Sequence, residues 1–284
     1  MEAVSKPLLE HFDPFGLTLA RFAAGLAVLL AASAVTGRTG ELSSMRARTA
    51  ASLLLLGFLN TFLAMSLLQL AVKYSSASAA ATLICSNPIL VLLYSVLTGR
   101  ERPSLLRLAA FAAGVSGVLL VWRSEGGSGG GAVPALASAA AFAAYTLAGK
   151  SLAARVSPLN ANIVSFAGGT ASLAVFMAAE GRRVFDAGWT PSAADIASIL
   201  WLGLVVSGAG YLAFFGMLKS SPASSASLVF FAKPAVATLL SMALLGETPG
   251  AGFLPGLVLV TAGSAAGLLS ETTASRGTPS GDSA

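Results

Sequence analysis

Nine long runs of apolar residues alternate with short polar connections along almost the whole chain. Each run holds about 20 residues, the length of α-helix that crosses a hydrocarbon layer of roughly 30 Å. The connections consist mainly of Gly, Pro, Ser and charged residues, which favour turns and the membrane surface. The pattern predicts an all-α integral membrane protein with spans at Phe15–Thr36, Thr49–Val72, Ser75–Leu97, Ser104–Trp122, Ala132–Ala153, Leu159–Glu180, Ala193–Leu218, Pro222–Leu245 and Gly250–Ser270.

The second half of the chain repeats the first. Without a gap, Ala77–Gly117 matches the segment 146 residues later at 10 of 41 positions. Both copies have a small-residue entry, a proline inside the apolar run, and Glu-x-Pro before the next run. The matching positions include Pro88 with Pro234 and Glu101 with Glu247. A duplicated membrane module is typical of a transporter.

The beginning of the chain matches the second half at an offset of 144, which pairs Lys6 with Lys150. Lys150 ends a full apolar run that starts at Ala132, whereas only five residues precede Lys6. The module therefore has five helices, and the first copy lacks most of its opening helix. Either a misassigned start or a shorter natural variant explains this, and we favour the misassigned start.

An odd number of helices per module makes the second copy enter the membrane from the opposite side. The sequence thus predicts a ten-helix inverted repeat of 5+5 helices. Ten Lys and Arg residues fall in the connections on the side of the C-terminus and five on the other side, which indicates a cytoplasmic C-terminus. The expected organisation is a first repeat at 1–123, a Gly/Ser linker at 124–131, a second repeat at 132–270 and a disordered cytoplasmic tail at 271–284.

Composition narrows the function classes. Hydrophobic residues make up 55% of the chain and charged residues 10%, against roughly a quarter charged in a soluble domain. The net charge of +5 is scattered between apolar runs and forms no basic face, so nucleic-acid binding is not expected. One histidine, His11, and one cysteine, Cys85, offer neither a metal cluster nor a disulfide framework. We therefore expect a protein that is not an enzyme and has no cofactor.

Acidic residues are expected only at span ends, in connections and in the terminal segments. Proton-driven exchangers commonly keep an Asp or Glu inside the bilayer as a relay. Because the apolar runs show none, we expect a facilitator that moves its substrate down a gradient.

Lys233 lies in the middle of an apolar run and is followed by Pro234. An unpaired ammonium there costs several kcal/mol, so the side chain faces protein or water. One interpretation is that it binds an anionic group of a substrate in a central cavity. The other is that it bonds to carbonyls freed by the kink at Pro234, or to a neighbouring helix. Its repeat mate is Asn87, followed by Pro88, so both halves place a hydrogen-bonding group before a proline at one depth.

Further polar and aromatic residues lie inside the spans. Asn60 either joins helices or contacts substrate. Arg21 lies about two turns into its span and either reaches the outer interface or pairs inside the bundle. Tyr145, Trp201 and Phe230 are aromatic candidates for the cavity wall. Glu101 and Glu247 are expected to cap or orient the following helix at the interface.

The repeated pattern Ala-Ser-x-Ala, Pro, Glu-x-Pro and Gly resembles EamA-type members of the drug/metabolite transporter superfamily. Leu19-Ala20-Arg21-Phe22 resembles the second helix of that family, and Phe231-Ala232-Lys233-Pro234 the ninth. The resemblance implies ten helices and a central cavity bordered by helices 1, 3, 4, 6, 8 and 9. It also implies outward movement of small metabolites, such as amino acids or amphipathic compounds, across a bacterial inner membrane.

The sequence therefore predicts a multi-pass inner-membrane exporter that works by alternating access on a small-molecule substrate, as a monomer or homodimer in the lipid bilayer. The cavity candidates are Lys233, Asn87, Asn60, Tyr145, Trp201 and Phe230, with kinks at Pro88 and Pro234. One alternative is a proton-coupled exporter of cationic drugs, favoured if the missing part of the first helix carries a Glu. The other is an inactive form or partner subunit, because the first helix is shortened.

Overall fold

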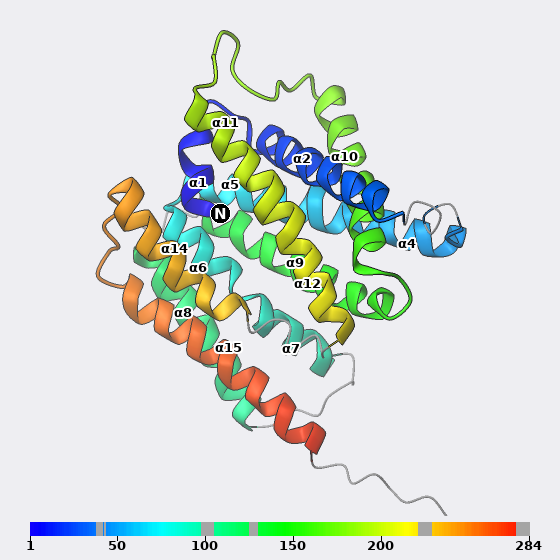
Figure 1. Cartoon of the computed structure of the whole chain (residues 1–284). Helices are drawn as coiled ribbons and strands as arrows, with labels where there is room; N and C mark the ends of the chain where they lie inside the picture. Colours follow the sequence, from blue (N-terminus) through cyan, green and yellow to red (C-terminus); the bar gives the residue numbers. More distant parts are fainter. Residues whose placement is uncertain (38–41, 43, 98–104, 125–129, 221–228, 277–284) are drawn as a thin grey trace, which may run out of the picture.

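A computed structural model describes residues 1–37, 42, 44–97, 105–124, 130–220 and 229–276 (Figure 1). Within these residues the chain is helical, and its one isolated β-bridge joins Phe12 to Phe185. The prediction of an all-α fold is therefore confirmed. In chain order the helices are α1 (Glu2–Leu8), α2 (Pro14–Val35), α4 (Ala47–Gly57), η1 (Phe58–Met65), α5 (Ser66–Tyr74), α6 (Ala77–Ile84), α7 (Asn87–Leu97), α8 (Leu105–Ser124), α9 (Ala132–Ala153), α10 (Pro158–Ala179), α11 (Ala193–Leu200), η2 (Trp201–Ala209), α12 (Gly210–Ser220), α14 (Val229–Leu245) and α15 (Phe253–Arg276).

Two pairs of helices in the two halves correspond in length as well as in order. Helices α2 and α10 each have 22 residues and start 144 residues apart. The continuous helices Ala47–Tyr74 and Ala193–Ser220 each have 28 residues and start 146 residues apart. Each of these long helices contains a π-helical segment, η1 or η2. With the continuous helices and the α6–α7 pair each taken as one, the described parts of the chain form ten helical segments in two sets of five, the number that the inverted-repeat prediction requires.

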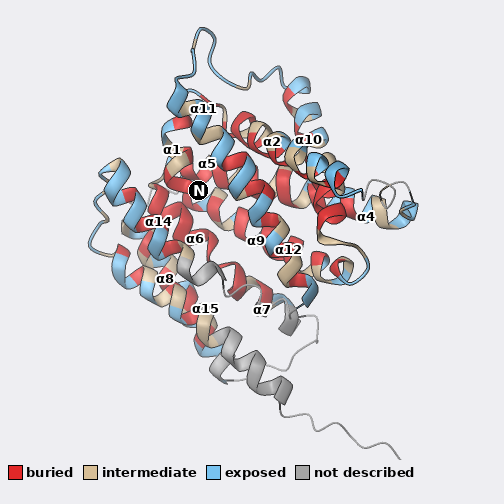
Figure 2. Ribbon diagram, viewed as in Figure 1, coloured by how far each residue is buried: buried red, intermediate tan, exposed pale blue. Residues whose placement is uncertain are grey.

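Five of the described helices are long and apolar enough to cross a membrane: Pro14–Val35, Ala47–Tyr74, Ala132–Ala153, Pro158–Ala179 and Ala193–Ser220. Apolar side chains cover their outward faces, whereas buried residues gather in the middle of the bundle (Figure 2). Outward apolar faces combined with an interior that holds polar groups suit a protein surrounded by lipid.

The span expected at Ser75–Leu97 is two helices, which corrects the prediction of one continuous span. Helix α6 ends at Ile84 and α7 begins at Asn87. Pro88 disfavours helical geometry in the residue before it and has no N–H to donate, so the preceding turn is interrupted at Cys85 and Ser86. The hydroxyl of Ser86 donates to the Leu83 carbonyl at 2.7 Å and satisfies one carbonyl at the break.

Helix starts follow from capping residues that the repeat preserves in position. The Asp13 carboxylate accepts from the backbone N–H of Phe15 at 2.9 Å and is followed by Pro14 at the first turn of α2. Ser157, 144 residues later, caps α10 in the same way and is also followed by a proline. A polar cap followed by proline is a strong start signal, so both helices begin within one residue of their predicted positions.

Small residues let the helices of the core approach closely. Gly57 of α4 lies directly against the backbone of Ser165 in α10, where a β-carbon would overlap the carbonyl oxygen. Gly25 of α2 packs against Gly203 and Ser207 of η2. Helix α15 packs along α8 through Gly117 and Gly256. These contacts join helices by backbone proximity, as is usual in lipid.

Two expectations concern the ends of the chain. The structure has a seven-residue helix, α1, where the first helix of the module is expected. That the remainder of this helix is encoded upstream stays a prediction. Helix α15 continues to Arg276, six residues into the expected disordered tail, and residues 271–276 contain neither Gly nor Pro.

Candidate functional site

A buried ion pair joins the two halves of the chain. The Oε1 atom of Glu2 in α1 lies 2.7 Å from Nζ of Lys233 in α14, and the Glu2 side chain is 1% exposed. Lys233 is 25% exposed on the same measure. Helix α1 packs against α5, α6 and α14, which places Glu2 between the first and second halves (Figure 1). Lys233 therefore bonds to a carboxylate on a neighbouring helix, as the structural interpretation allows, and this contact leaves its role in substrate binding a prediction.

Glu2 corrects the expectation that the spans hold no acidic residue. The offset of 144 that pairs Lys6 with Lys150 places Glu2 opposite Thr146, which is buried well inside the 22-residue helix α9. The same offset therefore indicated, from the sequence alone, that Glu2 lies at the depth of a span interior. A residue so close to the start of the sequence is otherwise expected in a terminal segment.

Arg21 of α2 is fully buried, at 0% exposed. This excludes the interpretation that the side chain reaches the interface and favours a position inside the bundle. Its Nη1 atom lies 2.7 Å from the sulfur of Met1, a weak acceptor. Its Nε and Nη2 atoms have no hydrogen-bond partner. Arg21 lies within electrostatic range of Glu2 and Tyr211, so it belongs to the same cluster as the ion pair.

Asn60 and Tyr145 border this cluster on helices of opposite halves. The hydroxyl of Tyr211 donates to Oδ1 of Asn60 at 3.2 Å, whereas Nδ2 of Asn60 has no partner. The Tyr145 ring, fully buried in α9, lies with its centroid 6.4 Å from that of Tyr211 and 6.3 Å from that of Phe214. The Tyr145 hydroxyl has no partner. Polar atoms and aromatic rings thus alternate around the ion pair.

The π-helical segments place polar residues into the core. Asn60 lies in η1 and Ser207 in η2, and both side chains are buried with a polar atom that has no partner. A π-helical turn inserts an extra residue and redirects the side chains around it, and such turns are frequent at functional sites. Sequence periodicity did not indicate them.

The two proline-associated positions differ in their surroundings. Asn87 is buried, and both its amide nitrogen and its amide oxygen lack a partner. Pro88 stands at the start of α7, next to the helix break, while Pro234 lies inside α14, which continues through it. The prediction of a proline within a continuous helix therefore applies to Pro234 and not to Pro88.

Two predicted residues are not brought into the cluster. Trp201 is 52% exposed, and its indole makes no ring contact with the described aromatic side chains. The side chain of Phe230 lies outside the described residues, as does Glu101. Of the six cavity candidates, the structure brings Lys233, Asn60 and Tyr145 to one cluster and buries Asn87. Glu2 and Arg21 are additions to that set.

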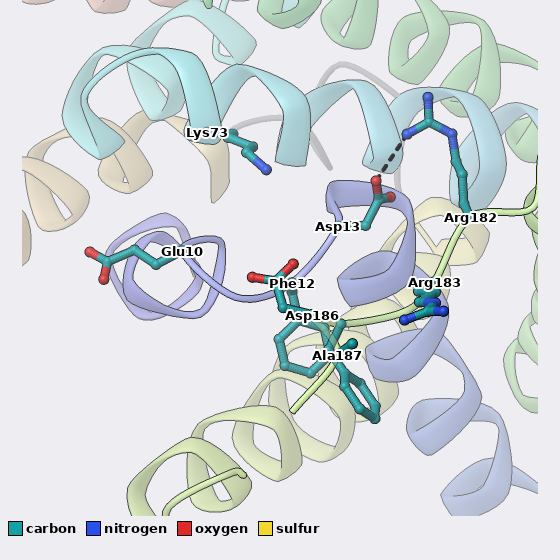
Figure 3. Close-up of a pocket in the computed structure, with 9 residues that line it drawn as sticks. Glu10, Phe12, Asp13, Lys73, Arg182, Arg183, Asp186 and Ala187 are labelled. Atoms are coloured by element: carbon teal, nitrogen blue, oxygen red, sulfur yellow. Dashed lines mark hydrogen bonds and ion pairs between the residues drawn. The ribbon is translucent and has the colours of Figure 1, made fainter. Parts of the chain in front are cut away.

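The two ends of the bundle can be named by arginines that lie on them: the Arg182 face and the Arg46 face. On the Arg182 face, the loop after α10 is fixed to the α1–α2 connection by an ion pair between Arg182 Nη1 and Asp13 Oδ2 at 2.9 Å. A cavity of about 390 Å³ lies there, and charged side chains surround it from three segments (Figure 3). It is lined by Glu10, Phe12, Asp13, Lys73, Arg182, Arg183, Phe185, Asp186 and Ala187.

Glu247 holds the two halves together on the Arg182 face. Its carboxylate accepts hydrogen bonds from the N–H of Ala77 at 2.7 Å, the N–H of Ser78 at 3.2 Å and the Ser78 hydroxyl at 2.7 Å. These donors lie at the start of α6, where a carboxylate also complements the helix dipole. The prediction that Glu247 caps the following helix is wrong in its target, because the carboxylate caps α6 of the other half.

The repeated lysines have a structural role. Lys6 Nζ donates to the carbonyl of Val72 at 2.8 Å, near the end of α5. Lys150 Nζ donates to the carbonyl of Leu218 at 2.7 Å, near the end of α12. The acceptors are 146 residues apart, so each half closes its long helix with the same contact. Cations are favoured at helix C-termini, which explains these two positions without any substrate.

Among the described residues, no group of three His, Cys, Asp or Glu side chains is arranged to hold a metal ion. Cys85 is buried and is not in a disulfide. The cluster around Glu2 and Lys233 offers hydrogen bonds and charge, and the Cys85 side chain lies within electrostatic range of Lys233.

Comparison with known proteins gives the family. The model of the EamA-like transporter family matches residues 2–123 and 129–267. The chain belongs to the EamA-like transporter family. It is a membrane transporter, and the resemblance inferred from the repeated motifs is confirmed.

Relatives agree with this assignment. A protein of Clostridium kluyveri described as an uncharacterized transporter is 28% identical over 260 residues, which cover 89% of this chain and 82% of that protein. An uncharacterized transporter of Archaeoglobus fulgidus is 28% identical over 180 residues, 63% of each chain. A solved crystal structure covers 92% of this chain and 89% of its own, with a TM-score of 0.66 and 21% identity, and supports the fold.

Proposed function

We propose that this transporter exports small organic metabolites, amino acids or related amphipathic compounds, across a bacterial inner membrane by alternating access. The observation that carries the proposal is the buried Glu2–Lys233 pair between the two halves. Polar atoms without partners surround it. Each such atom costs about 1–3 kcal/mol when it is buried and unpaired. Groups of this kind are expected where a polar substrate or water occupies a pathway.

The proposed binding site consists of Lys233 with Glu2, together with Asn87, Asn60 and Tyr145. Trp201 is left out of the site because its side chain is half exposed, and Phe230 stays a proposed residue of the cavity wall. Glu2 and Lys233 come from opposite halves, so a movement of one half against the other changes the contact between them. That coupling is what an alternating-access site needs.

The proposed movement uses the interrupted helix α6–α7 and the proline-containing helix α14. Release of Glu247 from Ala77 and Ser78 opens the Arg182 face, and its rebinding closes that face. We assign the Arg182 face to the outside and the Arg46 face, with the C-terminus, to the cytoplasm, following the distribution of Lys and Arg. The repeats proposed as domains are 1–123 and 132–270, joined by 124–131, in a monomer or homodimer.

A metabolite export comparison tests this function. Bacteria expressing the full chain should accumulate one or more amphipathic metabolites in the medium, relative to cells expressing the Glu2→Gln variant at the same membrane abundance. Identical media would contradict export. If the purified chain also showed no counterflow of any accumulated metabolite, the alternative of an inactive form or partner subunit would replace the proposal.

A second candidate function gains support from Glu2. A buried carboxylate is the residue that a proton-coupled exporter of cationic drugs requires, and its absence from the spans was the reason for expecting a facilitator. Lys233 argues against a cationic substrate, since a cation must displace the ammonium from Glu2 at 2.7 Å. Flux in proteoliposomes with and without a pH gradient separates the two mechanisms. Flux that requires the gradient favours coupling, and equal flux favours the facilitator.

A further inference from the structure

We propose that Arg21 is the residue that recognises the substrate, and that the substrate is an organic monoanion with a carboxylate on an apolar, aromatic-sized body. This inference rests on the proposed function and narrows its substrate class. It also transfers to Arg21 the carboxylate-binding role that the sequence favoured for Lys233.

The first argument is the free edge of the Arg21 guanidinium. Nε and Nη2 form one edge of this planar group, and their N–H bonds point in parallel toward the same side. Both atoms are buried and lack a partner, while Nη1 on the other edge contacts the Met1 sulfur. Two parallel donors match the two oxygens of a carboxylate, which is the arrangement that gives arginine its preference for this group.

The second argument is the excess of positive charge in the cluster. The cluster contains three cationic groups, Arg21, Lys233 and the N-terminal ammonium of Met1, and one carboxylate, Glu2. Glu2 lies 2.7 Å from Lys233 and 3.7 Å from the Met1 nitrogen, so Arg21 has no carboxylate of its own. A buried charge without a counter-ion is strongly unfavourable. A monoanion reduces this excess charge, whereas a zwitterion leaves it in place and a cation increases it.

The third argument is the apolar surface beside the guanidinium. The Phe22 ring lies 4.7 Å from the Arg21 guanidinium carbon and 5.5 Å from the Tyr211 ring. Tyr145 continues this aromatic surface toward Phe214 and keeps a free hydroxyl. A ligand whose carboxylate meets Arg21 therefore has aromatic rings beside its body. The substrate class that fits is an amphipathic carboxylate rather than a small inorganic anion.

Three probes with a shared phenylethyl body isolate the charge: 3-phenylpropionate, phenylalanine and phenethylamine. The purified full chain should unfold at higher temperature with 3-phenylpropionate, less so with phenylalanine, and without change with phenethylamine. Arg21→Gln should weaken 3-phenylpropionate binding by about 10- to 100-fold, the loss expected for hydrogen bonds to a charged group. Arg182→Gln makes the same substitution at an exposed ion pair and should bind as the parent does.

The ligand-free variant supplies an independent readout. Arg21→Gln should unfold at a higher temperature than the parent, because it removes an uncompensated charge. An arginine with a purely structural role gives the opposite result. Arg21→Lys keeps the charge without the parallel donors, so it should bind 3-phenylpropionate more weakly than the parent while remaining folded. If Arg21→Gln does not fold, Arg21→Lys alone decides: binding equal to the parent overturns the inference.

Counterflow of 3-phenylpropionate in proteoliposomes separates this inference from the proposed function. Transport by the parent that is lost in Arg21→Gln supports both. Equal transport by parent and Arg21→Gln overturns the role of Arg21 and leaves the transporter proposal standing. Arg21-dependent binding without transport supports the site and counts against export. The inference is also overturned if the parent binds none of the probes, or binds phenethylamine best.

Discussion

The Glu2–Lys233 pair allows a stability experiment whose outcome depends on the two residues being in contact. The perturbations are Glu2→Gln, Lys233→Met and the double variant, which remove the charges with little change in volume. At 2.7 Å and an effective dielectric constant of about 20, the attraction between the two charges is about 6 kcal/mol before desolvation is subtracted. Removing one partner leaves the other charge buried and unpaired, which costs about 3–5 kcal/mol.

The double variant should be far more stable than the sum of the single effects predicts, because neither charge then remains. We expect a coupling free energy of about 3 kcal/mol, measured by SDS-induced unfolding in mixed micelles and followed by the fluorescence of the three tryptophans. Glu10→Gln with Lys73→Met is the matched control, since both side chains are exposed; its coupling should stay below about 1 kcal/mol. Additivity within about 0.5 kcal/mol for Glu2 and Lys233 would refute the contact.

Three further predictions concern contacts that hold the bundle together. Glu247→Gln should lower the free energy of SDS-induced unfolding by about 2 kcal/mol, because charge-assisted hydrogen bonds at α6 are lost. Glu180→Gln changes a carboxylate at an exposed helix end and should have no measurable effect on that free energy. Gly57→Ala should lower the free energy of unfolding by about 1–3 kcal/mol, because the methyl group overlaps the backbone of α10. Gly216→Ala, with open space around it, should be neutral or stabilising. Equal effects of the two substitutions would contradict the close packing of Gly57 against α10. Lys150→Met should cost about 1 kcal/mol by removing the bond to the Leu218 carbonyl, and Lys219→Met, its exposed neighbour, should not.

Much of the architecture could be predicted from the sequence because a few physical constraints determine it. A span must be apolar over a fixed length, and its ends must be capped, so the run beginning at Phe15 and its counterpart at Leu159 gave helix bounds close to those observed. The internal repeat then supplied the topology. The helix break at Cys85 was also within reach, since Asn87-Pro88 disfavours a continuous helix.

The site was less predictable, for physical reasons that differ between residues. Asn60 and Tyr145 were found because polar groups inside apolar runs are costly and therefore conspicuous. The π-helical turns that orient Asn60 depend on packing between helices, which a periodic pattern does not encode. Trp201 was misleading because an aromatic side chain serves equally well on a lipid-facing surface, where the structure exposes half of it.

The burial of Glu2 and Arg21 is hard to predict from their positions in the chain. The offset that pairs Lys6 with Lys150 also located Glu2 at the depth of a helix interior, but the short distance to Met1 suggested a terminal segment. Arg21 lies close enough to a helix start for its long side chain to reach the interface, and only the packed structure excludes that conformation. Contacts between residues far apart in sequence decided both positions.

In alternating access, the buried cluster around Glu2 and Lys233 becomes accessible from each side of the membrane in turn. Cysteine accessibility tests it directly, with Asn60→Cys in a Cys85→Ser background, a membrane-impermeant maleimide, and vesicles of both orientations. We predict labelling of Asn60→Cys from both sides and no labelling of Leu53→Cys, a buried apolar control in the same long helix. Labelling from neither side, or from one side only, would contradict alternating access at this cluster.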